Sequence, residues 1–166
     1  MQLARQAVDY IQSEAATEER GEWCYSHSEI KLEAPVLNPS KIACVGHNYR
    51  EHILEMGREI PTHPVVFAKF ANAVIVPDDN IPYPSVTEKL DYEAEFAFVI
   101  GETGERCRRE GALAYVAGYT IVNDVSARDM QMRTLQWLHG KSLDGSAPMG
   151  PWLATKDEVP DPDVII

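Results

Sequence analysis

An alternating run at residues 90–101, with the sequence LDYEAEFAFVIG, constrains the fold of this chain more than any other segment. A β-strand has a side-chain period of two, so Glu93 and Glu95 leave the same face of the strand that this run predicts. The opposite face carries the apolar side chains that we expect to pack into a core, namely Tyr92, Ala94, Phe96 and Phe98.

The spacing of Glu93 and Glu95 also has a chemical consequence. Two parallel carboxylates repel each other and resist burial unless a cation, a proton or a basic side chain joins them. A divalent metal ion would satisfy both at once. The alternative is a half-buried strand whose polar side is acidic, because alternation is typical of any surface strand. The pattern alone leaves both interpretations open.

A third carboxylate, Asp124, follows a second predicted strand. Residues 115–124 form an apolar run rich in β-branched and aromatic side chains, which indicates a buried strand that ends at Asn123 and Asp124. Residues 125–138 have the composition of a helix, with Ser126 as the expected N-cap. Asp124 therefore lies either where a ligand-binding side chain is easily presented or where an aspartate simply caps a turn or helix.

The remaining segments predict a chain of short elements. Helical spacing over residues 3–19 indicates one amphipathic helix, whose apolar side carries Leu3, Ala7, Tyr10 and Ile11. We expect strands at residues 41–46, 65–69 and 73–76, a linker at 35–40, a loop at 78–85 and a short helix at 48–56. Residues 57–64 contain one glycine and two prolines, which suits a hinge.

Composition excludes some classes of partner. The chain has 15 basic and 26 acidic residues, a net charge of -11 and no basic cluster, so we expect neither nucleic acid nor an anionic membrane as a partner. It has no apolar run of transmembrane length and no signal-peptide core at its N-terminus. Cys24, Cys44 and Cys107 are widely spaced and read as reduced thiols, so a cytoplasmic location is expected.

Five motifs occur in a fixed order along the chain: GHNYREH at 46–52, DYEAE at 91–95, GYTIVNDVSARD at 118–129, GKSLD at 140–144 and PMGP at 148–151. This series closely resembles the fumarylacetoacetate hydrolase family, in particular its acylpyruvase and oxaloacetate decarboxylase branch. The resemblance covers residues 34–162, most of the chain. It implies an α+β fold, a mixed β-sandwich or β-roll of the fumarylacetoacetase C-terminal-domain type.

The resemblance also implies a metal site. Glu93, Glu95 and Asp124 match the family's three carboxylate ligands for Mg²⁺ or Mn²⁺. Hard oxygen donors suit these ions, which prefer octahedral sites and keep waters that a substrate can displace. Zinc is disfavoured because the histidines at 47 and 52 do not have the i, i+4 spacing of the zinc helix motif.

Further residues match the family's substrate and catalytic positions. Arg128, Gln131 and Lys141 fall where the family places polar groups around a small anionic keto-acid substrate, and Lys141 also has a catalytic role there. His52 and Glu55 match a His/Glu pair on a short mobile lid helix. At i and i+3 they share one helical face, so Glu55 can orient the imidazole, which then acts as a general base toward water.

The resemblance predicts residues 1–34 as a short N-terminal helical and linker segment and residues 35–166 as a catalytic domain that is incomplete at its C-terminus. Its main functional implication is metal-dependent hydrolysis of a carbon–carbon bond in small β-dicarbonyl acids such as acylpyruvates. Oxaloacetate-type decarboxylation and hydroxy-dienoate isomerisation remain alternatives on the same site, as does a non-catalytic metal-binding remnant. Family members commonly dimerise, so a homodimer is a further expectation.

Overall fold

The computed structural model describes residues 2–13 and 24–160. The chain divides into two compact units, Met1–Lys31 and Leu32–Ile166. The first unit contains helix α1 (Gln2–Gln12) and the 3-10 helix η2 (His27–Glu29). Helix α1 confirms the first part of the helix predicted over residues 3–19, whereas residues 14–19 lie outside the described residues.

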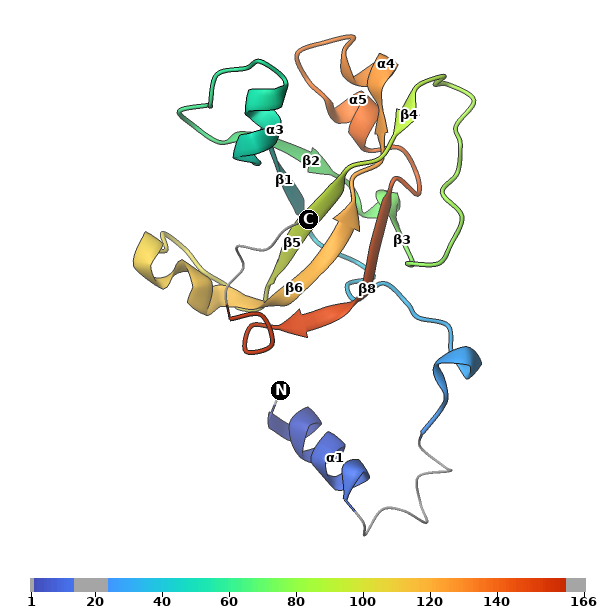
Figure 1. Cartoon of the computed structure of the whole chain (residues 1–166), viewed down its shortest axis with the longest axis vertical. Coiled ribbons are helices and arrows are strands. Elements are labelled where there is room, and N and C mark those ends of the chain that lie inside the picture. The colour runs from blue at the N-terminus through green and yellow to red at the C-terminus, as the bar shows by residue number, and fades with distance from the viewer. Residues whose placement is uncertain (1, 14–23, 161–166) are drawn as a thin grey trace. The chain divides into compact units, whose positions relative to one another are not determined.

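The second unit contains the β-sheet and the short elements seen in Figure 1. Its elements are β1 (Ile42–Gly46), α3 (Arg50–Glu55), β2 (Val65–Lys69), η3 (Ala71–Ala73), β3 (Val74–Ile75), β4 (Leu90–Asp91), β5 (Ala94–Ile100), η4 (Arg109–Tyr115), β6 (Val116–Asn123), β7 (Ser126–Ala127), α4 (Arg128–Gln131), α5 (Leu138–Lys141) and β8 (Ala147–Thr155).

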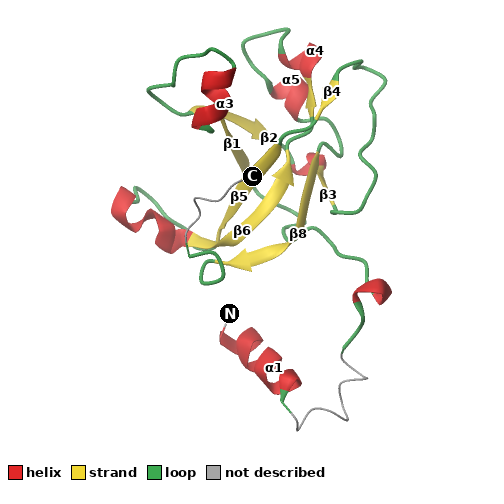
Figure 2. Cartoon of the chain, viewed as in Figure 1, coloured by secondary structure: helices red, strands yellow, loops and turns green. Residues whose placement is uncertain are grey.

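The main sheet has four strands in the order β3-β8-β6-β5, and two small ribbons, β1-β2 and β4-β7, accompany it. The pairs β8-β6 and β6-β5 are antiparallel, whereas β3 pairs parallel with β8. Figure 2 shows the strands curling across the middle of the unit, with only short helical segments at its margins. This mixed, curled sheet confirms the predicted α+β fold class.

The acidic run at residues 90–101 forms two strands rather than one. β4 pairs with β7 and β5 pairs with β6, so Glu93 lies in the break between them. The Asn123 side chain accepts a hydrogen bond from the Glu93 amide at 3.2 Å, and the Glu93 carbonyl accepts one from the Asp124 amide at 2.8 Å. The break therefore fixes the backbone of Glu93 beside Asp124.

The predicted assignment of faces in this run is wrong. Tyr92 is 76% exposed, Phe98 is 61% exposed and Ala94 is exposed as well. Only Phe96 among the predicted core residues is half-buried, where its ring stacks on Tyr119 with 5.2 Å between the centroids. The larger apolar side chains of β5 thus lie on the outer face of the sheet.

The opposite face of β5, which carries Glu95, turns toward the interior. Ala97 on this face packs against the core, which is built from small and medium side chains, namely Ala34, Ala73, Val122, Ala147 and Met149. A carboxylate on an interior face is costly unless a cation or a hydrogen bond accompanies it. The Tyr49 side chain supplies this hydrogen bond to Glu95, and the charge of Lys141 also acts on the carboxylate.

The helix predicted over residues 125–138, with Ser126 as its N-cap, is also wrong. The segment forms β7 and the four-residue helix α4, and only its last residue, Leu138, begins the next helix, α5. Ser126 is completely buried in β7, and its hydroxyl donates a hydrogen bond to the Asp124 carbonyl at 2.9 Å. The serine therefore fixes the turn that follows Asp124, and pairing of β7 with β4 prevents a helix from starting there.

Helix α3 confirms the short helix predicted between the first two strands of this unit. Its Ile53 is 2% exposed and anchors the helix to the sheet, whereas Gly57 follows it with a φ of 64°, in the left-handed region that glycine adopts without steric cost. None of the described helices has the length and apolar character needed to cross a membrane.

Candidate metal and substrate site

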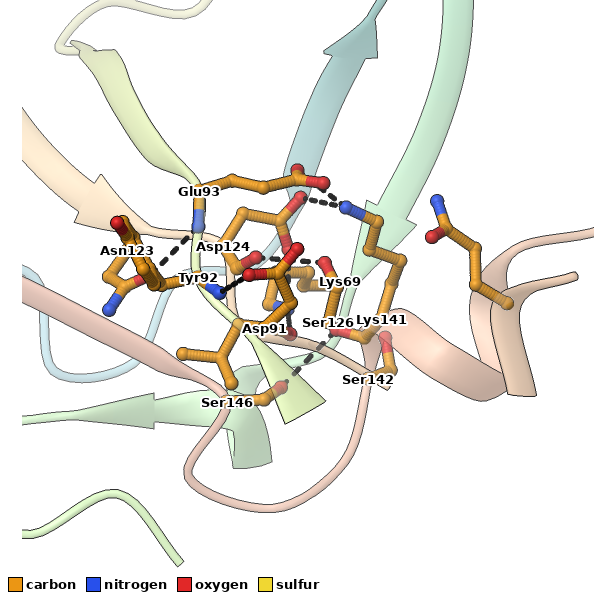
Figure 3. Close-up of polar contacts among 12 residues, drawn as sticks. Lys69, Asp91, Tyr92, Glu93, Asn123, Asp124, Ser126, Lys141, Ser142 and Ser146 are labelled. Atoms are coloured by element: carbon orange, nitrogen blue, oxygen red, sulfur yellow. Dashed lines mark hydrogen bonds and ion pairs between the residues drawn. The ribbon is translucent and has the colours of Figure 1, made fainter. Parts of the chain in front are cut away.

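Two carboxylates and two lysines converge where β4, β6, β2 and α5 meet (Figure 3). Lys141 Nζ donates to Glu93 Oε2 at 2.6 Å and to Asp124 Oδ2 at 2.8 Å. Lys69 Nζ donates to Asp124 Oδ1 at 2.7 Å, and Arg128 Nη1 donates to Glu93 Oε1. Every carboxylate oxygen of Glu93 and Asp124 therefore has a cationic partner.

Lys69 is a site residue that the sequence analysis missed. It ends β2, its side chain is completely buried, and its ammonium also donates to the Val125 carbonyl at 3.1 Å. Burial lowers the pKa of Lys69, while the negative charge of Asp124 opposes this shift. The sequence does indicate this residue, because Lys69 ends the otherwise apolar run VVFAK at 65–69. A charged side chain in such a run needs a partner inside the fold.

Arg128 links the cluster to the surface. Its Nε and Nη2 atoms lie 2.9 Å and 2.8 Å from Asp91 Oδ2, and its Nη1 donates to Gln131 Oε1 at 3.1 Å. Burial opposes the charge of Arg128, but its contacts with Asp91 and Glu93 outweigh burial and raise the pKa of the guanidinium. The hydrogen bond from Arg128 in turn lowers the pKa of Asp91. Both Arg128 and Gln131 are thus held at the edge of the carboxylate cluster.

Glu95 is half-buried beside this cluster. Its pKa is raised, first because burial disfavours the charged carboxylate and then because the negative charges of Glu93 and Asp124 act on it. The charges of the two other predicted metal ligands thus act on Glu95, so Glu95 lies near both of them.

The donor set fits a hard divalent cation, but the described residues are not arranged as a ready metal site. Within residues 2–13 and 24–160, no group of three histidine, cysteine, aspartate or glutamate side chains is positioned to hold a metal ion. The cause is visible in the cluster itself, since the ammonium of Lys141 lies between the carboxylates of Glu93 and Asp124. The oxygens that a metal would need are present and are paired with a cationic side chain.

The position of Lys141 depends on the glycine before it. A Cβ atom at Gly140 would lie 2.6 Å from the Ala127 carbonyl oxygen and 2.6 Å from the Gln131 amide nitrogen. Only glycine lets the backbone of α5 approach β7 and α4 so closely. This contact brings Lys141, which is 1% exposed, to the carboxylates.

The predicted catalytic pair lies on the surface of α3. His52 and Glu55 are both exposed, and they form no hydrogen bond with each other in the described part of the chain. His47 has the better-defined surroundings: its Nε2 lies 3.0 Å from Arg58 Nη1, and its ring packs edge-on against Trp137 with 5.6 Å between the centroids. The role of His52 and Glu55 stays a prediction.

His47 directly precedes the helix predicted to act as a lid, and the charge of Glu93 acts on it. Burial lowers the pKa of His47, followed by the effects of Arg58 and His52, while the charge of Glu93 opposes them. The residue just before the helix predicted to act as a lid therefore lies within electrostatic reach of Glu93. A cavity of about 300 Å³ lies under this segment, lined in part by His47 and Ile53, but none of the carboxylates described above lines it.

The three cysteines are free thiols. Cys44 on β1 is the one near the cluster, because the charges of Asp124, Lys69 and Lys141 all act on it. Burial, followed by the charge of Asp124, raises the pKa of the Cys44 thiol to about 11. At neutral pH it is an uncharged thiol and does not compete for a metal ion as a thiolate.

Carboxylates, lysines and an arginine thus gather beside a curled mixed sheet. Residues 41–166 match the family model described as fumarylacetoacetate (FAA) hydrolase C-terminal. The chain belongs to the fumarylacetoacetate hydrolase family, which confirms the resemblance seen in the sequence.

Two curated proteins are examples of the relatives to which this chain is similar. The chain is 48% identical over 139 residues to oxaloacetate tautomerase fahd2, mitochondrial, of Xenopus laevis, a match that covers 82% of this chain and 44% of the relative. It is 47% identical over 164 residues to oxaloacetate tautomerase YisK of Bacillus subtilis, covering 96% of this chain and 54% of the relative. The chain thus spans about half the length of the curated relatives it matches.

A solved structure agrees with the fold. The crystal structure of 5-carboxymethyl-2-hydroxymuconate delta-isomerase from Mycobacterium smegmatis matches with a TM-score of 0.71 and 40% sequence identity. The match covers 79% of this chain and 52% of the isomerase chain. Both comparisons therefore relate this chain to proteins that are named as tautomerases or isomerases.

Proposed function

We propose that this domain isomerises a small 2-oxo dicarboxylate of the oxaloacetate type between its keto and enol forms, with a divalent cation held by Glu93, Glu95 and Asp124. The observation that carries the proposal is the convergence of Glu93 and Asp124 on one ammonium group beside Glu95. These are hard oxygen donors already gathered around a positive charge, the kind of site that Mg²⁺ and Mn²⁺ occupy.

The names of the relatives favour isomerisation over the carbon–carbon hydrolysis expected from the sequence. The two relatives described above are oxaloacetate tautomerases, and the solved neighbour is an isomerase. Hydrolysis and decarboxylation remain reactions that the same residues would support, because all three pass through an enolate of a 2-oxo acid.

Enolisation needs one proton removed from carbon 3 of the substrate, between the keto carbon and the distal carboxylate. The electron pair of that carbon–hydrogen bond becomes the carbon 2–carbon 3 double bond, and the keto oxygen takes up the negative charge and then a proton. No bond between heavy atoms breaks, so water is not a reactant. The chemistry that a divalent cation supplies when bound is stabilisation of the charge on the keto oxygen.

The chain's own residues have separate tasks in this proposal. Lys141 and Arg128 supply local positive charge that attracts a dianion to a chain whose net charge is -11. Gln131, which Arg128 holds at 3.1 Å, offers an amide that orients a substrate carboxylate. His52 on α3 is the proton acceptor, and Glu55 lies on the same helical face, from which it can orient the imidazole.

The proposal is tested by following the ultraviolet absorbance of enol oxaloacetate after mixing with the chain and Mn²⁺. We expect the chain to accelerate decay of the enol signal, and we expect Asp124→Asn to reduce that acceleration by roughly 10²–10³-fold, as when one electrostatic stabiliser is removed. Asp78→Asn, a change in an exposed loop residue, is the matched control. Release of pyruvate from acetylpyruvate without any effect on oxaloacetate tautomers would contradict isomerisation and favour hydrolysis.

A further inference from the structure

We infer that Lys141 is the displaceable cation of this site: its ammonium occupies the position between Glu93 and Asp124 that a divalent ion takes, and binding of that ion releases Lys141 toward the substrate. The inference rests on the metal role proposed above for the three carboxylates. It follows from the partners of the three cationic side chains in the cluster, because one of them must give way before a metal can bridge Glu93 and Asp124.

Lys69 is not the side chain that gives way. Its ammonium is held by two acceptors, Asp124 Oδ1 at 2.7 Å and the Val125 carbonyl at 3.1 Å. The second acceptor is a backbone carbonyl, and Lys69 is its cationic partner among the described residues. Moving Lys69 out would leave the Val125 carbonyl without this hydrogen bond, which is costly for a buried acceptor. Lys69 is thus a fixed counter-ion of Asp124.

Arg128 is also held by groups outside the metal ligands. Two of its nitrogens contact Asp91 Oδ2, at 2.9 Å and 2.8 Å, and a third donates to Gln131 at 3.1 Å. If its contact with Glu93 opened, these bonds would still hold the guanidinium in place. Arg128 therefore can release Glu93 Oε1 but does not lie between Glu93 and Asp124.

Lys141 differs from both. In the described part of the chain its ammonium has hydrogen bonds only with Glu93 Oε2 and Asp124 Oδ2, and its other polar contact is the face of the Phe67 ring, 5.0 Å from the ring centroid. It takes one oxygen from each carboxylate, as a bridging metal would. A lysine has four rotatable carbon–carbon bonds behind its charge, so the ammonium can move while Gly140 keeps the backbone in place.

Metal and ammonium then compete for the same pair of oxygens. Without the metal, the charge of Lys141 neutralises the carboxylates and is withheld from the substrate. With the metal bound, like charges repel and the ammonium moves away from the cation. An anionic substrate would gain the freed ammonium as a partner only in the metal-loaded site, so metal binding precedes and promotes substrate binding.

The test is the affinity of the full chain for Mn²⁺, measured by isothermal titration in the absence of substrate. Lys141→Met is expected to tighten Mn²⁺ binding by roughly tenfold or more relative to Lys41→Met, since a close competing charge is removed. Lys41 is exposed, so this control carries the same loss of net charge. Lys141→Gln, which keeps a polar side chain of similar reach, is expected to act in the same direction if the methionine variant folds poorly.

Lys69→Met provides the contrast, because the inference expects no tightening beyond the Lys41→Met control. Equal or weaker Mn²⁺ binding in both Lys141 variants would overturn the inference, and so would equal tightening in Lys69→Met. Tighter binding in the Lys141 variants alone would support it even if the chain failed to isomerise oxaloacetate, in which case only the proposed function would fail. A purely structural role for Lys141 would not raise metal affinity.

Discussion

Replacing Lys69 by methionine is expected to lower the free energy of unfolding by about 3–5 kcal/mol, the usual cost of removing one partner from a buried ion pair. The side chains of Lys69 and Asp124 are 0% and 4% exposed, so water cannot replace the lost ammonium. Asp124 would keep Lys141 as a partner for one oxygen, while its other oxygen and the Val125 carbonyl would be left unpaired.

Urea unfolding followed by circular dichroism measures this loss. Lys41→Met, an exposed lysine next to β1, serves as the control and is expected to change stability by less than about 0.5 kcal/mol. If the Lys69 and Lys41 variants proved equally stable, Lys141 alone would suffice for Asp124, and Lys69 could not be described as its fixed counter-ion.

Replacing His52 by alanine is expected to slow the proposed isomerisation by roughly 10²–10⁴-fold, the usual contribution of a positioned general base. Mn²⁺ affinity should stay the same, because His52 lies exposed on α3 and is not among the carboxylate cluster's partners. Glu55→Gln should produce a smaller loss of the same kind, since Glu55 would only orient the imidazole from the same helical face.

Steady-state rates with oxaloacetate, together with Mn²⁺ titrations, separate the possible roles of His52. His63→Ala changes an exposed histidine in the loop between α3 and β2. This variant should keep the rate within about twofold, because surface substitutions away from a site have small effects. Decarboxylation of oxaloacetate should suffer less than isomerisation, because it needs no proton acceptor. If the His52 variant lost activity and metal affinity together, a structural role would replace the catalytic one.

The strands could be predicted because their signals are local. The β-branched run of β6 and the apolar run of β2 determine their conformations wherever they lie in the fold. The break at Glu93 could not be predicted in this way, since it depends on the Asn123 side chain, which is distant in sequence. The same holds for Ser126, whose burial follows from the pairing of β7 with β4.

The carboxylates of the site could be identified from the sequence, whereas only some of their counter-ions could. Glu93, Glu95 and Asp124 stand out because acids inside apolar runs require an explanation. The family resemblance indicated Lys141 and Arg128 as substrate groups, which stays a prediction, and in the structure both contact Glu93. Lys69 gave only a weak signal at the end of β2, and its pairing with Asp124 is a contact between distant segments.

Anomalous diffraction from crystals of the chain grown with Mn²⁺ and oxalate, a mimic of a 2-oxo acid, is the most direct test of the metal site. We expect one manganese peak within coordination distance of the Glu93, Glu95 and Asp124 carboxylates, with Lys141 moved off them and onto the oxalate. Manganese bound elsewhere, or an unchanged Lys141 bridge between Glu93 and Asp124 with no peak beside it, would contradict the assignment of these carboxylates as metal ligands.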